Sequence, residues 1–444
     1  MTEYSEFDKM SPRQNPGKVN VPDHRRFFDE LAERIKAYLY DDSVNAATDP
    51  LGLVHFYSLL DFPARFLDIT HNLDLDEAEA TLVLVLASHM QRRGVCAWRT
   101  DSRMFGDTLE SLDSATDSLL ERGLVIAMPD ESEIDKRSQL GLPILLSADI
   151  FGILFQGLEY CVNFSVGLSA QGRIVRCDDI ASRTLYYDAG TQEEVNRLLA
   201  ALFADRFGAI MDRLSQRGRR RTMSCLLYGP PGTGKTELAL QIARSTGRNI
   251  VQADIAKMTG TYVGESERNY RSLFTAYRYA AKVMVITPIL LLNEADSFLS
   301  RRVHVSRSTD KYENNLQNIL LEELESFEGI LMATTNHTEG IDDAFDRRFF
   351  MKVEIGVPGR DTRLRIWQDV MPALSTDEVS LLADGFVLSG AQISNVATRY
   401  DFIVVLEDRN PSFSELVDLC RAEENRATGQ RRNKIGFGKV IGSK

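Results

Sequence analysis

The chain has 444 residues, of which 43% are apolar, and its formal net charge is −12. This length and composition predict two or three domains with real hydrophobic cores. No segment approaches the ~20 consecutive apolar residues that a membrane-spanning helix requires, and the scattered cysteines contain no C-x-x-C pair that would indicate a zinc site or a disulfide framework. We therefore expect a cytoplasmic protein without a membrane span.

Charge is unevenly distributed along the chain. Residues 1–190 carry 31 acidic and 18 basic side chains, whereas the rest of the chain is close to neutral. An acidic N-terminal half is poorly suited to the phosphate backbone of nucleic acid, so nucleic acid is not the expected partner. The last residues, 429–444, form a basic tail without an acidic side chain.

Residues 1–22 are polar and contain three prolines, which predicts a disordered segment. Residues 23–175 are expected to form a mostly helical domain, with helices at residues 76–90 and 108–124. Within it, residues 114–127 are typical of a helix followed by a short strand, a pattern that resembles the second half of a winged helix. Winged helices bind proteins as well as DNA, and the acidity of this half favours a protein.

From residue 176 to residue 360 the pattern changes to alternating strands and helices. Most of the predicted strands are near-continuous apolar runs, as a buried parallel sheet requires, and the helical stretches between them imply right-handed crossovers. From residue 361 to residue 428 the chain is helical again, so we predict an α/β domain followed by a helical domain. The strands are predicted at residues 224–228, 249–253, 288–292, 329–335 and 352–357.

The most specific motif is the sequence Gly-Pro-Pro-Gly-Thr-Gly-Lys-Thr at residues 229–236, which matches the phosphate-binding loop G-x-x-x-x-G-K-[ST]. It lies between a predicted strand and a helix-forming run, which is the context that the motif needs. Its glycines let backbone N–H groups face phosphate oxygens, and the helix N-terminus favours the same charge. We expect Lys235 to reach the terminal phosphates and the Thr236 hydroxyl to bind Mg²⁺. The predicted nucleotide contacts are Gly229, Pro230, Pro231, Gly232, Thr233, Gly234, Lys235, Thr236 and Glu237.

Polar side chains follow two of the apolar strands. The sequence Asn-Glu-Ala-Asp at residues 293–296 ends the third strand, and Glu294 is expected to orient the attacking water. Asn293 stands where a carboxylate normally supports the Mg²⁺ shell; an amide still accepts a hydrogen bond from a metal-bound water, but it lacks the charge. Asn336 follows the fourth strand, where it is either a group that holds the water or the γ-phosphate, or a turn residue.

Two adjacent arginines, Arg347 and Arg348, follow the fourth strand at a greater distance. They are either a solvated charge pair or arginine fingers that act on a neighbouring subunit. Arginine fingers stabilise the charge of the transferring phosphoryl group.

Taken together and in this order, these motifs resemble the AAA-type module of the AAA+ ATPases over residues 190–400. Gly390 and Ala391 stand where other AAA+ branches place a lid arginine, which indicates the AAA clade. The resemblance is closest to a group of bacterial AAA-family ATPases that also contain Asn-Glu-Ala-Asp. It implies a P-loop NTPase sheet with a C-terminal helical lid, ATP and Mg²⁺ as cofactors, and contacts from Gly390 and Ala391 to the nucleotide.

The resemblance also implies an ATP-dependent homohexameric ring with ATP at the subunit junctions, because head-to-tail interfaces that close form rings. In such a ring Arg347 and Arg348 complete the neighbour's site. The sequence Tyr262-Val263-Gly264 resembles the aromatic–hydrophobic–Gly pore loop of substrate-threading AAA proteins, in which an aromatic ring offers a large contact area to a passing peptide. The alternative is that Tyr262 packs in the core.

Three functions stay open at this point. The first is an ATP-driven remodeller of a protein substrate or adaptor, which the N-terminal half would recruit. The second is a nucleotide-dependent assembly switch that hydrolyses ATP slowly because Asn293 replaces a carboxylate. The third is a DNA-associated regulator that uses the segment resembling a winged helix, although the acidity of this half counts against it. The chain has no H-E-x-x-H motif, which excludes a fused zinc protease within it.

Overall fold

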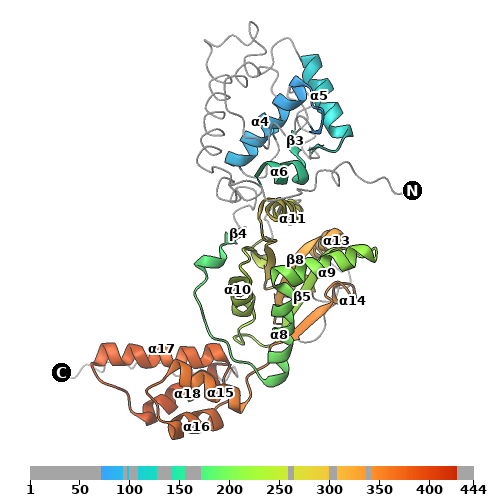
Figure 1. The fold of residues 1–444 in the computed structure, drawn as a ribbon. Helices are drawn as coiled ribbons and strands as arrows, with labels where there is room; N and C mark the ends of the chain where they lie inside the picture. The colour runs from blue at the N-terminus through green and yellow to red at the C-terminus, as the bar shows by residue number, and fades with distance from the viewer. Residues whose placement is uncertain are drawn as a thin grey trace, which may run out of the picture.

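The computed structural model describes residues 72–93, 98–99, 109–127, 143–155, 172–258, 265–299, 308–336 and 342–427. The predicted disordered segment, the pore-loop residues 262–264 and the basic tail lie outside these ranges, so the expectations about them stay predictions. Figure 1 shows three parts in chain order, which are N-terminal helices in blue, an α/β domain in green to orange and a helical C-terminal part in orange to red.

The α/β domain is built on a six-stranded sheet with the order β4-β6-β7-β8-β5-β9. The five predicted strands correspond to β5 to β9 and pair in parallel, which confirms the predicted fold class. A short additional strand, β4, pairs antiparallel with β6 at the edge of the sheet. The strands are β4 (Gly172–Val175), β5 (Thr222–Tyr228), β6 (Ile250–Asp254), β7 (Ile289–Asn293), β8 (Gly329–Thr335) and β9 (Met351–Glu354).

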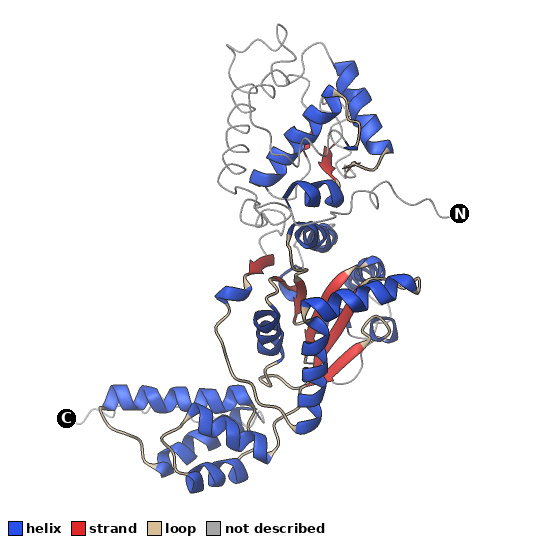
Figure 2. Ribbon diagram, viewed as in Figure 1, coloured by secondary structure: helices blue, strands red, loops and turns tan. Residues whose placement is uncertain are grey.

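Helices cover both faces of this sheet (Figure 2). Residues alternate between the faces along β5, because Leu226 packs in one hydrophobic cluster with α11 and α13, whereas Cys225 and Leu227 pack in another with α8, α9 and α10. Burial on both sides explains why the strands are continuous apolar runs. The longer helices are α8 (Ala189–Leu202), α9 (Ala204–Gln216), α10 (Lys235–Thr246), α11 (Glu265–Val283) and α13 (Ser308–Ser326). The short ones are η6 (Cys177–Asp179), η7 (Ile255–Met258), α12 (Asp296–Leu299) and α14 (Asp343–Asp346).

The C-terminal part is a bundle of helices with a hydrophobic core of its own around the buried Trp367. Two of its helices begin with capping boxes. The side chains of Ser375 and Ser389 each accept a hydrogen bond from the backbone N–H three residues later, and the side chain of that later residue accepts one from the serine N–H. Among the described helices of the chain, none is long and apolar enough to cross a membrane. The bundle consists of α15 (Arg360–Val370), α16 (Thr376–Gly385), α17 (Gly390–Glu407) and α18 (Phe413–Ala427).

The described N-terminal residues combine helices with a small antiparallel sheet of order β1-β3-β2. The predicted helices are present as α4 and α5, and β2 follows α5 as expected for the second half of a winged helix. The boundaries of this domain stay a prediction. The elements are α4 (Glu77–Arg93), β1 (Trp98–Arg99), α5 (Leu109–Glu121), β2 (Val125–Ala127), β3 (Pro143–Leu146) and α6 (Ala148–Phe155).

Helix α6 joins the N-terminal part to the α/β domain by packing against α11. The ring of Phe151 meets that of Tyr279 edge-on at 5.2 Å between centroids, and Asp149 forms an ion pair with Lys282. The backbones are so close at Gly152 that a Cβ there would lie 2.6 Å from the Cβ of Lys282. Residues of both parts consequently belong to one hydrophobic cluster.

Gly152→Ala is expected to destabilise this junction, because the new methyl group must push α6 away from α11. Overpacking of this kind costs about 1–3 kcal/mol, which denaturant unfolding monitored by circular dichroism would detect. Gly208→Ala on α9 is the matched control, since a Cβ at Gly208 meets no atom within 4 Å. An equal effect of the two substitutions would contradict the close approach at Gly152.

Candidate functional site

A cavity of about 1060 Å³ opens at the carboxyl ends of β5, β7 and β8, beside the helical C-terminal part. Its walls come from stretches of chain that are far apart in sequence, among them residues 182–188, 231–237 and 334–336, together with residues of α15 and the start of α17. Carboxyl ends of parallel strands are the usual place for ligands in open α/β sheets. The cavity brings together Lys235, Thr236, Glu294, Asn336, Gly390 and Ala391, all of which the sequence singled out.

The phosphate-binding loop takes a conformation that depends on its glycines. Gly229, Gly232 and Gly234 have φ values of 141°, 77° and 97°, which residues with a Cβ rarely adopt. Gly229 also passes so close to β9 that a Cβ would lie 2.2 Å from the carbonyl oxygen of Ile355. Helix α10 begins at Lys235, immediately after the loop, so its N-terminal N–H groups face the same space. The loop therefore has the form of an anion site.

Lys235 is held over this loop, and only 7% of its surface is exposed. Its Nζ donates to the carbonyl oxygens of Gly229 and Pro230 at 2.8 and 2.7 Å. Burial lowers the pKa of this ammonium, and the negative charge of Asp296 opposes that shift. An anionic phosphate oxygen is a stronger acceptor than either carbonyl, so the side chain is placed to bind the terminal phosphates.

Thr236 and Asn293, for which the sequence predicts a role in binding Mg²⁺, are in contact, and that role stays a prediction. The Thr236 hydroxyl donates to Oδ1 of Asn293 at 3.3 Å, and the Thr334 hydroxyl lies 3.4 Å from the same oxygen. No cluster of three or more His, Cys, Asp or Glu side chains that could hold a metal occurs within the described ranges. This neutral donor set fits Mg²⁺ that arrives on nucleotide phosphates and keeps several waters, rather than a free ion held by carboxylates.

Glu294 follows Asn293 at the cavity, in an unusual backbone conformation. Its φ of 51° is left-handed, which is uncommon for a residue with a side chain. Its N–H donates to the Thr334 hydroxyl at 3.2 Å, which holds the turn in place. The carboxylate is exposed at the cavity, where a water beside the terminal phosphate would be within its range.

Asp296 contacts a predicted site residue, although the sequence analysis assigned it no role. Its carboxylate accepts from the backbone N–H of Asn336 at 2.7 Å, from the Asn336 side chain at 3.3 Å and from the Thr335 hydroxyl. These bonds fix Asn336 at the end of β8, facing the phosphate loop. The signal was present, because Asp296 is the last residue of the Asn-Glu-Ala-Asp sequence.

The segment at residues 182–188 was also missed, because aromatic residues in a loop carry no motif. Leu185, Tyr186 and Tyr187 line the cavity opposite Ile366 and Val370 of α15. Apolar and aromatic walls with few polar groups are typical of sites for flat ligands such as a nucleotide base. Leu185, Tyr186 and Tyr187 thus add an apolar surface to a cavity whose other wall is the phosphate loop.

The helical C-terminal part closes the cavity from the side. The N–H of Ala391 donates to the carbonyl oxygen of Gly232 at 3.1 Å, which places the start of α17 directly on the phosphate loop. Asp188 links the loop before α8 to the same part, since its carboxylate accepts from the N–H of Gly359 at 3.1 Å and from the Thr362 hydroxyl. The predicted contacts of Gly390 and Ala391 with a nucleotide are therefore geometrically available.

Arg347 and Arg348 do not line this cavity. They lie between α14 and β9, at the amino end of the sheet, whereas the phosphate loop leaves the carboxyl end of β5. Arg348 donates to the carbonyl oxygen of Ala344 at 3.3 Å and pairs with Glu325 at 3.5 Å, while Arg347 is exposed. Neither arginine can act on the nucleotide of its own chain in this arrangement.

A glycine-rich loop between a parallel strand and a helix, with polar residues at the ends of the neighbouring strands, defines a P-loop nucleotide-binding domain. The family model described as "ATPase family associated with various cellular activities (AAA)" matches residues 225–357. The chain therefore carries an ATPase domain of the AAA family. The closer resemblance to the bacterial group with Asn-Glu-Ala-Asp stays a prediction.

Several named proteins are similar to part of this chain. Spastin of Danio rerio is 31% identical over 51% of this chain and 38% of its own length. The proteasome-activating nucleotidase of Sulfurisphaera tokodaii is 29% identical over 45% of this chain and 52% of its own. The 26S proteasome subunit RPT4 of Saccharomyces cerevisiae is 32% identical over 42% of this chain and 44% of its own. The chain thus spans about half or less of the length of these relatives.

Among solved structures, the FIGL-1 AAA domain in complex with ADP aligns with 57% of this chain and 87% of that chain. The sequence identity is 20% and the TM-score is 0.44.

Asp296→Ala is expected to slow ATP turnover about as much as Asn336→Ala, because both changes remove the oriented amide from the site. The double variant should be no slower than either single one, since the two residues act through one contact. Steady-state ATPase rates with a nucleotide-binding assay as the control would measure this. Additive effects of the two substitutions would show that Asp296 has another role.

Proposed function

We propose that this chain hydrolyses ATP and uses the energy to remodel other proteins as a ring of identical subunits. The observation that carries the hydrolysis step is the convergence of Thr236, Glu294 and Asn336 on the phosphate loop in one cavity, with Asn293 hydrogen-bonded to Thr236 beside it. Match to the AAA family model over residues 225–357 supports the same conclusion.

The site residues divide the work of phosphoryl transfer between them. The loop N–H groups and Lys235 bind the β- and γ-phosphates, and Mg²⁺, when bound, supplies the charge that neutralises them. Glu294 orients a water in line with the terminal phosphate and takes up its proton. Asn336, fixed by Asp296, holds the γ-phosphate or the attacking water.

Asn293 is the residue whose lack of charge bears most directly on the expected hydrolysis rate. Its Oδ1 still accepts a hydrogen bond from the Thr236 hydroxyl, so it can accept one from a metal-bound water. The missing negative charge weakens the hold on Mg²⁺. This favours measurable but slower turnover, and it gives the second candidate function, an assembly switch that scarcely hydrolyses ATP, its specific support.

Self-assembly is the third element of the proposal. Arg347 and Arg348 lie at the opposite end of the sheet from the cavity of their own chain. The nucleotide that they can reach is therefore one bound by a neighbouring chain. One of the similar proteins, RPT4, is named as a subunit of a larger assembly. A head-to-tail ring, expected to be a hexamer formed with ATP in the cytoplasm, places such arginines at the next subunit's phosphates.

The proposal that the chain remodels a protein substrate depends on segments outside the ATPase site. The N-terminal part, residues 23–175, is proposed to recruit the substrate or an adaptor. Tyr262, Val263 and Gly264 are proposed to grip a passing peptide, and they lie outside the described residues. The names of proteasome-associated relatives agree with a protein substrate rather than nucleic acid.

Glu294→Gln is expected to keep ATP binding but to reduce turnover strongly, because only the group that orients and deprotonates water is lost. The wild-type chain should hydrolyse ATP measurably with Mg²⁺. An ATPase assay beside equilibrium binding of a fluorescent ATP analogue would separate the two steps. If the wild type shows no turnover and Asn293→Asp restores it, the assembly switch is the better description.

Arg347→Ala is expected to bind ATP normally and to hydrolyse it poorly. Mixing the Arg347→Ala chain with the Glu294→Gln chain should recover part of the activity, because some junctions then combine an intact site with an intact arginine. Arginine fingers contribute about 10³–10⁵ in rate in small GTPases, so a few restored junctions are measurable. No recovery in rings confirmed as mixed by native mass spectrometry would refute action between subunits.

A further inference from the structure

The last two turns of α17 expose large apolar side chains that the packing of the fold does not use. Phe402, Val405 and Leu406 are 63%, 80% and 78% exposed, and all the buried residues of this helix lie earlier, within residues 393–397. Figure 1 shows this end of α17 standing out from the other helices of the C-terminal part. Contiguous apolar surface of this kind indicates a place where a partner binds.

The same surface is negatively charged. Asp401, Glu407 and Asp408 are exposed beside the apolar side chains, and the last turn of α17 contains no basic residue. The C-terminal end of a helix adds partial negative charge from its free carbonyl groups. Arg409, which follows the helix, pairs with Glu407 and Glu415 and offsets part of this charge. We call this surface the α17 tip; its members are Asp401, Phe402, Val405, Leu406, Glu407 and Asp408.

An occupant that fits the α17 tip combines apolar side chains with positive charge. The basic tail, residues 429–444, has this composition, and it lies outside the described residues. Its basic side chains, which are accompanied by no acidic one, are Arg431, Arg432, Lys434, Lys439 and Lys444. Its large apolar side chains, which stand between the lysines, are Ile435, Phe437, Val440 and Ile441.

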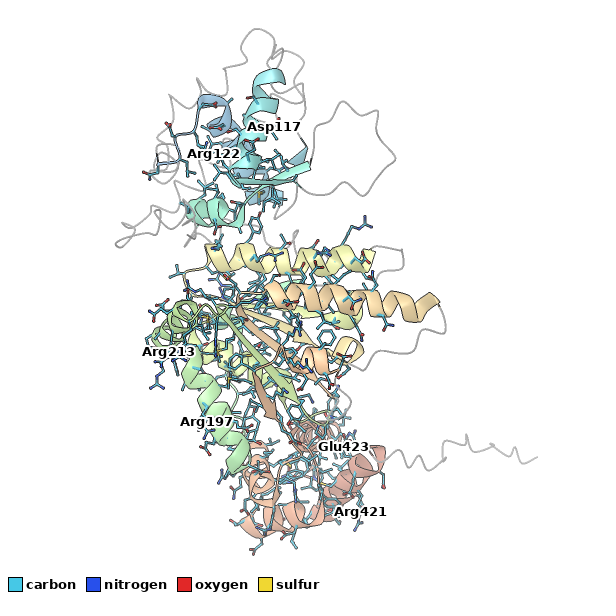
Figure 3. The ribbon with its side chains drawn as sticks, turned by 90° about the vertical axis from the view of Figure 1, so that its right-hand side faces the viewer. Asp117, Arg122, Arg197, Arg213, Arg421 and Glu423 are labelled. Atoms are coloured by element: carbon cyan, nitrogen blue, oxygen red, sulfur yellow. The ribbon has the colours of Figure 1, made fainter. Side chains whose placement is uncertain are left out.

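The helix that leads into the tail runs back along α17. Glu423, near the end of α18, accepts from the side chain of Asn395 at 3.0 Å and pairs with Arg399 at 2.7 Å. Figure 3 shows Glu423 on the side of the helical part nearer the α/β domain, whereas Arg421 lies on the far side. Helix α18 is therefore antiparallel to α17 and ends beside its first half.

The tail is long enough to return to the tip from there. The rise along α17 from Arg399 to Leu406 is about 10 Å. The chain from Ala427 to Phe437 spans about 30 Å when it is extended. The apolar residues in the middle of the tail can consequently reach the tip without any movement of α18.

We propose that the basic tail docks on the α17 tip of its own chain and covers the exposed apolar side chains there. Ile435 and Phe437 pack on Phe402, Val405 and Leu406, and the basic side chains of the tail approach the carboxylates of the tip. Removal of the apolar surface from water is the driving force, and opposite charge sets the register. This contact goes beyond the proposed ATPase function and does not depend on it.

The tether favours the tail of the same chain over any other occupant. A segment that is joined to its site by a short flexible connection has an effective concentration of about millimolar. A second copy of the chain reaches such a concentration only in very concentrated solution. The α17 tip is thus open to another partner only while the tail is released.

Photo-crosslinking from the tip tests this contact in the full chain without nucleotide. Leu406→benzoylphenylalanine places a photoreactive group at the tip, and irradiation should link it to residues 431–441. Chains labelled with heavy nitrogen are mixed with unlabelled chains, so that mass spectrometry of the digested product separates links within one chain from links between chains. Leu381→benzoylphenylalanine is the matched control, since Leu381 is 61% exposed on α16 and should give no link to the tail.

The position of the links decides the outcome. Links from position 406 to the tail of the same chain support the proposal. Links between chains alone show that a second copy occupies the tip, and links to another part of the same chain show a different cover, so both results overturn it. The absence of any link from position 406 and from Val405→benzoylphenylalanine, which repeats the experiment one residue away, overturns it as well.

Charge reversal in the crosslinking chain tests the electrostatic part of the contact. Arg431→Glu/Arg432→Glu should lower the yield of the link about tenfold, because like charges then face each other. Adding Asp401→Lys/Glu407→Lys to that chain should restore the yield, since the charges are again opposite. A yield that stays low in the combined variant would contradict the proposed charge matching.

Arg217→Glu/Arg219→Glu is the matched control for this reversal. Both arginines are exposed on the α/β domain, at the end of α9, so the same change of charge should leave the yield of the link unaltered. A loss of yield equal to that of the tail variant would show that only the net charge of the chain matters, which overturns the proposed contact.

Phe437→Asp tests the apolar part by a second measurement. Loss of the ring should uncover the tip and raise the fluorescence of a hydrophobic dye several-fold, while circular dichroism stays unchanged. Ser443→Asp is the matched control, because it adds the same charge to the tail without removing an apolar side chain. Equal dye binding by Phe437→Asp and the wild-type chain would overturn the proposal.

Discussion

The constraint on which the site depends is the close approach of the phosphate loop to β9. Gly229 leaves β5 so near the carbonyl of Ile355 that no side chain fits between them, and this forces the loop to turn over the end of the sheet. The turn aligns the loop with the first N–H groups of α10. It also brings the Nζ of Lys235 back onto the carbonyl oxygens of Gly229 and Pro230. Because β7 and β8 end at the same level, their last side chains reach the loop without further adjustment.

The rest of the site follows from parallel pairing. In the register of the sheet, the ends of β7 and β8 are neighbours, so Asn293 and Asn336 face the loop although they are far apart in sequence. The Thr334 hydroxyl then fixes the turn at Glu294. Thr334 donates toward Asn293 and accepts from the Glu294 N–H, which stabilises the left-handed backbone that turns the carboxylate to the cavity. A neutral residue in place of a carboxylate at Asn293 thus changes the charge of the site while the hydrogen-bond pattern is kept.

Local sequence patterns predicted the parts of this protein that depend on local physics. Buried parallel strands are apolar on both faces, so β5 to β9 were found within a few residues, whereas β4 is four residues at an edge and has little to distinguish it. The loop motif predicted Lys235 and Thr236, because the chemistry of phosphate requires those types at that spacing. Asp188 and Tyr186 could not be predicted, because their roles arise only when the chain before α8 packs on α15.

The packing of α6 on α11 has a consequence for how force passes through the molecule. Helix α11 begins just after residues 262–264, and near its other end Lys282 and Tyr279 are held by α6. An N-terminal domain on a flexible tether would let a captured protein drift with respect to the motor. Here the two parts share one hydrophobic cluster, so in the proposed remodeller a load pulled at one end of α11 would be borne at the other end by the N-terminal part.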